Sequence, residues 1–169
     1  DGGANLTGGA ESSPWGYGKE RPAVKAIDGN YFLVLGQDCK NISHAGSHLV
    51  IALLYQSSGS LAKRVVNHIA THTNTSFYLS ENSLCLLDSS TALIRFVDPS
   101  SNLEYQIKFD IKTGANPSDC FVAEISRVVV PHSSAQYMGL VEFDSATALS
   151  VFQDAENSNY LSTKNVEVG

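Results

Sequence analysis

The chain has 169 residues, of which 43% are hydrophobic and 17% charged, and its net charge is −6. This length suits one domain with a continuous apolar core, and the 11 Lys and Arg residues are too scattered to form the basic stripe that neutralises nucleic-acid phosphates. The longest apolar run, Leu49–Tyr55, is far shorter than a membrane-spanning helix, so we expect neither a nucleic-acid partner nor a membrane span in this chain.

The N-terminal segment differs in composition from the rest of the chain. Residues 1–18 are rich in Gly and also contain Ser, Asn and Pro, which contribute little to a core, so we predict a flexible lead-in followed by one domain over residues 19–169. Trp15 and Tyr17 interrupt this segment. Such aromatic residues are typical of a terminus that is pinned to the body of a domain, and they are also our candidates for a partner-binding loop.

Residues 31–35 predict the first strand, because an apolar run follows the turn signal Asp-Gly-Asn at 28–30. The next segment, residues 43–72, favours two helices joined by a tight turn at Ser57–Ser60. Its first part, His48–Gln56, is apolar all round and also fits a central strand, which periodicity alone does not decide. We predict a helix there because the segment is rich in Leu and Ala.

The second helix is predicted over the part of this segment that follows the turn. Apolar residues recur there at the spacing of one helical face, and charged and polar residues occupy the other face. The apolar positions are Leu61, Ala62, Val65, Val66 and Ile69.

The second half of the chain predicts antiparallel strands. Residues 103–111 alternate between apolar and polar side chains, so one face of that strand is expected to be buried. Residues 92–97 are its predicted hairpin partner, joined through a Pro- and Asn-containing turn. Residues 120–130 and 137–143 predict further strands, with a bulge or an exit from the sheet near Arg127, and residues 144–153 predict a short final helix.

These elements together predict an α+β fold. Helices that precede a run of strands, without βαβ alternation, favour a helical hairpin packed on one face of a curved antiparallel sheet of about five strands.

Four histidines occur in two pairs with the same spacing, His44 with His48 and His68 with His72. On a helix, residues four apart lie on one face, where two imidazoles can bind zinc or another divalent transition metal. A reversal at Ser57–Ser60 would bring all four to one end of a helical hairpin. The alternatives are a pH-responsive cluster and ordinary surface histidines, and neither pair contains the glutamate of a zinc protease motif.

The three cysteines match no paired zinc or redox spacing. If the compartment is oxidising, Cys85 and Cys120 are the predicted disulfide, since both lie at or near strands that can be neighbours; buried free thiols are the alternative. Asn41 and Asn74 begin glycosylation triplets, although the number of such triplets in the chain is close to that expected by chance.

The sequence contains no catalytic, nucleotide-binding or dinucleotide motif, so we expect a protein that is not an enzyme. The chain starts at Asp1 and its only methionine is Met138, which indicates a processed end or a boundary inside a longer protein. Our leading hypothesis is an extracytoplasmic binding or assembly module without a cofactor that recognises a protein or glycan partner. The alternatives are a metal-binding protein that uses the histidines and a fragment of a secreted or viral surface glycoprotein.

Overall fold

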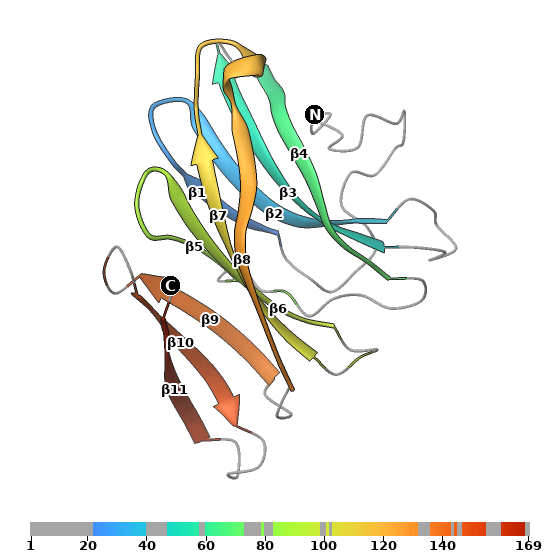
Figure 1. Cartoon of the computed structure of the whole chain (residues 1–169), viewed down its shortest axis with the longest axis vertical. Coiled ribbons are helices and arrows are strands. Elements are labelled where there is room, and N and C mark those ends of the chain that lie inside the picture. The colour runs from blue at the N-terminus through green and yellow to red at the C-terminus, as the bar shows by residue number, and fades with distance from the viewer. Residues whose placement is uncertain are drawn as a thin grey trace.

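The computed structural model consists almost entirely of antiparallel strands (Figure 1). It describes residues 22–39, 47–57, 60–72, 79, 83–98, 101, 103–131, 136–142, 144, 147–154 and 160–167. Within these ranges the one helical element is a short 3-10 turn, Pro117–Asp119. The predicted α+β fold with a helical hairpin is therefore wrong.

The strands form three sheets, each a meander in which sequential strands are neighbours. The first sheet contains β1 (Ala23–Ala26), β2 (Tyr31–Cys39), β3 (Ser47–Ser57) and β4 (Ser60–His72); the second contains β5 (Leu84–Leu86), β6 (Thr91–Asp98), β7 (Leu103–Lys112) and β8 (Phe121–Pro131); the third contains β9 (Gln136–Glu142), β10 (Thr147–Asp154) and β11 (Tyr160–Glu167).

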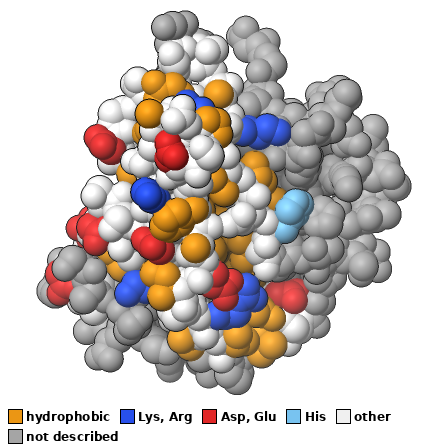
Figure 2. Space-filling view, turned by 45° about the horizontal axis from the view of Figure 1, so that its top comes forward, with side chains coloured by type: hydrophobic (Ala, Val, Ile, Leu, Met, Phe, Trp, Pro, Cys, Tyr) orange, Lys and Arg blue, Asp and Glu red, His pale blue; other side chains and the backbone are white. Residues whose placement is uncertain are grey.

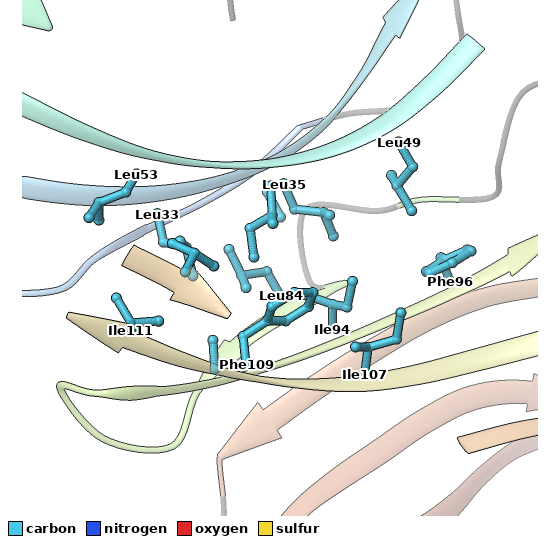
Figure 3. Packing of buried hydrophobic residues seen from close by; sticks show 14 of the residues in the cluster. Leu33, Leu35, Leu49, Leu53, Leu84, Ile94, Phe96, Ile107, Phe109 and Ile111 are labelled. Atoms are coloured by element: carbon cyan, nitrogen blue, oxygen red, sulfur yellow. The ribbon is translucent and has the colours of Figure 1, made fainter. Parts of the chain in front are cut away.

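The first two sheets pack face to face as a sandwich. Strand β1 contacts β5 and strand β4 contacts β8, so the two strand orders run the same way across the interface. Figure 3 shows the leucines of β2 and β3 pointing at the apolar side chains of the second sheet. The side chains in the centre of this core are fully or almost fully buried, and they include Leu33, Leu35, Leu49, Leu53, Ile94, Phe96, Ile107 and Phe109.

Strand β3 is buried on both faces, which explains its continuous apolar sequence. Leu49, Ile51 and Leu53 belong to the core between the sheets, whereas Val50 and Ala52 belong to a cluster on the opposite face. The helix predicted for His48–Gln56 is wrong, and the alternative of a central strand is correct. Burial of both faces removed the alternation that would have identified a strand.

Strand β4 was the second predicted helix, and two irregularities in its register explain the error. Residues Arg64 and Ile69 have no partner in the pairing of β4 with β3, because the register shifts by one residue at each of these positions. Across an extra residue, side chains three apart share a face: Ala62 and Val65 pair with Tyr55 and Leu53, which are two residues apart. This spacing imitates a helix. The reversal expected at Ser57–Ser60 is present, as a β-hairpin.

The third sheet packs against the outer face of the second. Leu140 of β9 and Ala148 of β10 form a buried cluster with Cys85, Leu87 and Leu93. The predicted final helix over residues 144–153 is wrong, because this segment contains most of β10. The strands predicted over residues 31–35, 92–97, 103–111, 120–130 and 137–143 are confirmed as β2, β6, β7, β8 and β9, with small differences in their ends.

Candidate functional site

Strand β8 is the edge of the second sheet, and its outward side is exposed. Among the described strands β8 pairs with β7 alone. Four of the seven large hydrophobic side chains that are exposed in the described part of the chain lie on this one strand: Phe121, Ile125, Val128 and Val129. An edge strand offers unpaired backbone N–H and C=O groups, so β8 combines free hydrogen-bonding groups with apolar side chains.

Only the beginning of β8 is covered by the first sheet. Val122 is buried in the core between the sheets, and the side-chain amide of Asn67 on β4 donates a hydrogen bond to the Val122 carbonyl. From Ala123 to Ile125 the side chains on both faces are exposed, although β8 continues to pair with β7. After Val122 most side chains of β8 are therefore exposed, although the β7 residues Phe109 and Ile107, with which Glu124 and Arg127 pair, are buried in the core.

The connection from β7 holds the start of β8 in place. The hydroxyl of Tyr31 on β2 donates a hydrogen bond to the carbonyl of Gly114, and the Cys120 thiol lies 3.5 Å from the same carbonyl. Burial, with the neighbouring Cys120 thiol, raises the pKa of Tyr31, so its hydroxyl keeps the proton that it donates. A side chain at Gly114 would place a Cβ 2.5 Å from the Cβ of Asp119, so only glycine fits there.

A bulge in β8 determines which side chains share a face. In the pairing of β8 with β7, Glu124 lies opposite Phe109 and Ser126 lies opposite Lys108, so Ile125 is the extra residue. Arg127 then lies opposite Ile107. Because Phe109 and Ile107 are two residues apart, they point to the same face, and so do their partners Glu124 and Arg127.

Glu124 and Arg127 form a partly exposed ion pair on β8. The Nε and Nη2 atoms of Arg127 donate hydrogen bonds of 2.9 and 2.7 Å to the two carboxylate oxygens of Glu124. The side chains are 34% exposed for Arg127 and 38% exposed for Glu124. The hydrogen bond to Glu124 raises the pKa of Arg127, and the guanidinium also lies 5.9 Å from the centre of the Tyr105 ring.

Strand β4 is the sandwich edge next to β8, and it differs from β8 in its side chains. Lys63 and Arg64 give it positive charge, and its two register irregularities interrupt a regular edge. The guanidinium of Arg64 lies 4.5 Å from the centre of the Tyr55 ring. Lysine, arginine and bulges at an edge discourage pairing with a foreign strand. The edge at β4 is therefore protected more strongly than the edge at β8.

The histidine site was predicted on two helices, but three of its four residues lie on strands. His48, His68 and His72 lie on the β3–β4 hairpin, and the register places them opposite Thr71, Val50 and Ser47 respectively. His44 lies outside the described residues. The described part of the chain contains no group of three or more metal-binding side chains. Metal binding stays a prediction, which metal analysis of the purified protein would test.

The two cysteines of the predicted disulfide are not brought together. Cys85 lies between the second and third sheets, Cys120 lies between the first and second sheets, and both are buried free thiols. Burial raises the pKa of the Cys85 thiol, which keeps it protonated. The other predicted site residues, Trp15, Tyr17, Asn41 and Asn74, lie outside the described residues.

Figure 2 shows that apolar side chains on one face of the molecule are interspersed with acidic and basic ones. Among the described residues, no helix is long and apolar enough to cross a membrane. Comparisons of this chain with protein-family models, with curated proteins and with solved structures gave no significant match.

Proposed function

We propose that this domain is a non-enzymatic protein-binding or assembly module, and that it recognises a partner by pairing an extended strand with β8. The observation that supports this proposal is the concentration of exposed apolar side chains on a strand whose outer edge is unpaired among the described strands. In this mode of recognition, backbone hydrogen bonds provide affinity and the side chains on either face provide specificity.

The chemistry of the edge favours a protein partner over a glycan. An added strand satisfies the alternating N–H and C=O groups of β8 along its whole exposed length, which the hydroxyl groups of a sugar do not match in spacing. Ile125 and Val128 offer branched apolar contacts, which suit side chains of a second strand. We also propose that the domain is extracytoplasmic. Glycan occupancy at Asn41 or Asn74 in the purified protein would test this location.

The proposal is tested by selecting displayed peptides against the folded domain. A library of random extended peptides is panned on the wild-type chain, and the selected peptides are measured against the variant Val128→Lys. We expect peptides with alternating apolar residues to be enriched, and we expect their binding to weaken about tenfold or more in this variant, because a lysine on an edge opposes strand addition.

The matched control is Val24→Lys on β1, the edge at the opposite side of the first sheet. Val24 is 52% exposed and Val128 is 51% exposed, so the two substitutions change the surface equally. Peptides that lose affinity only for the Val128 variant support the proposal. Peptides that bind both variants like the wild type would overturn it.

A further inference from the structure

We infer that the strand received by β8 is the β8 strand of a second copy of this chain, so that the domain forms a two-fold symmetric dimer. This inference rests on the proposed function and adds the identity of the partner. The two strands run antiparallel with the symmetry axis at Ser126, and Glu124 of each copy faces Arg127 of the other. The order of side chains along β8 supports this pairing.

The bulge makes β8 symmetric in charge about Ser126. Counted along the pairing with β7, Glu124 lies one step before Ser126 and Arg127 lies one step after it. In a regular strand, the three-residue spacing of Glu124 and Arg127 would place them on opposite faces. The extra residue Ile125 brings both onto one face, so that an antiparallel copy presents an arginine opposite each glutamate.

The neighbouring positions are also complementary in this arrangement. One step further from the axis, Ala123 of each copy faces Val128 of the other, and both residues are exposed in the single chain. Ser126 faces its own copy at the axis, where its small side chain avoids a clash and a repulsion of like charges. All cross-strand pairs from Ala123 to Val128 are therefore small, apolar or oppositely charged.

The ion pair of the single chain can be exchanged for two ion pairs between copies. Glu124 and Arg127 already form a bidentate pair within β8, and each retains more than a third of its side-chain exposure. Dimer formation replaces the partner of each charge and does not leave any charge unpaired. A partner strand with the reverse order of charges would place like charges together on this face, which is costly. The charge order of β8 is therefore complementary to a second copy.

The inference is tested by exchanging the charges. Glu124→Arg gives β8 two positive charges, and Arg127→Glu gives it two negative charges, so each variant repels its own copy. We expect sedimentation equilibrium to show a wild-type dimer and a dimer dissociation constant at least about tenfold weaker in each single variant. An equimolar mixture of the two variants should form a mixed dimer, and the variant with both exchanges should dimerise like the wild type.

The mixing experiment also controls for folding, because a variant that is unfolded cannot pair with its complement. Circular dichroism of each variant and the dimerisation of Val24→Lys complete the controls. A wild-type chain that stays monomeric at all concentrations, single variants that dimerise as well as the wild type, or a mixture that stays monomeric would each overturn the inference. A monomeric chain that still binds selected peptides at β8 would refute self-pairing and leave the proposed function intact.

Discussion

The second sheet contains two arginine–glutamate ion pairs with similar hydrogen-bond geometry. One pair is buried and the other is exposed to solvent. Arg95 on β6 and Glu104 on β7 form hydrogen bonds of 2.7 and 2.6 Å, and their side chains are only 4% and 8% exposed. Arg127 and Glu124 form bonds of 2.9 and 2.7 Å on the exposed part of β8. The hydrogen bonds of the two pairs are similar in length. A difference between the pairs in their contribution to stability or to recognition should therefore come from their burial.

The two charges of a buried pair stabilise each other because water cannot reach them. The two charges of an exposed pair can instead form ion pairs with charges on another molecule. Removing one member of the Arg95–Glu104 pair leaves the other charge in an environment without water, and Glu104 also accepts a hydrogen bond of 2.7 Å from Gln106. Removing Arg127 leaves Glu124 in contact with solvent, at little cost. The first pair therefore stabilises the fold, and the second is available for recognition.

The largest expected effect comes from breaking the buried pair. We expect Arg95→Met to lower the free energy of unfolding by about 3–5 kcal/mol, because the Glu104 carboxylate stays buried without its partner. Denaturant unfolding measures this change. Adding Glu104→Leu should recover much of the loss, since a pair of apolar side chains replaces the pair of charges. A single variant as stable as the wild type would show that the pair is not isolated from water.

Changing Gly114 should have the second largest effect, and it tests how the start of β8 is positioned. Gly114→Ala is expected to lower the free energy of unfolding by about 1–3 kcal/mol, because the new Cβ overlaps the Cβ of Asp119. Gly29→Ala is the comparison: Gly29 has a φ of +50° but open space around it, so its cost is backbone strain alone. Equal dimerisation of Gly114→Ala and the wild type would show that this connection does not position the exposed pair.

Breaking the exposed pair should change the stability of the single chain only slightly and its association strongly. We expect Arg127→Ala to alter the free energy of unfolding of the single chain by less than about 1 kcal/mol, while it weakens the dimer. Thermal unfolding at low protein concentration measures the first quantity, and sedimentation measures the second. A large loss of stability in the monomer would mean that Arg127 supports the fold and would remove the contrast between the two pairs.

A third carboxylate, Asp88 in the β5–β6 turn, has no arginine partner within the described part of the chain and should show the smallest effect. The backbone N–H of Ser90 donates a 2.7 Å hydrogen bond to Asp88 and lowers its pKa. Because the folded pKa lies below the unfolded one, the contribution of Asp88 to stability is present above about pH 4 and is lost as the pH falls through the folded pKa. Asp88→Ala should flatten this part of the dependence of stability on pH, and an unchanged curve would contradict the assignment.

Local signals predicted part of the fold correctly. The alternation over residues 103–111 and its turn to residues 92–97 identified the β6–β7 hairpin, because one face of β7 is more deeply buried than the other and no bulge interrupts its pairing with β6. The helical prediction failed for β3 and β4 for two different reasons. Strand β3 lacks alternation because both faces are buried, and β4 imitates a helix because Arg64 and Ile69 are extra residues in its register.

The candidate site was harder to predict from the sequence than the β6–β7 hairpin. The irregular pattern near Arg127 predicted a bulge or an exit from the sheet, and the structure has the bulge at Ile125. No pattern in the sequence indicated that the side chains of β8 after Val122 would be exposed, because exposure depends on which neighbouring elements cover the strand. Spacing alone also places Glu124 and Arg127 on opposite faces. Their shared face follows from the pairing with β7, which is a property of the whole sheet.

The bulge in β8 has a consequence for how this protein can change over evolution. Inserting a single residue between Ser126 and Arg127 would leave every charged and apolar side chain of β8 in the chain and would still move Glu124 and Arg127 to opposite sides of the sheet. The self-matching order of charges would then disappear without any substitution. In the proposed dimer, the choice of partner is therefore encoded by the number of residues in β8 as much as by their identity, and a single inserted residue is expected to abolish self-pairing.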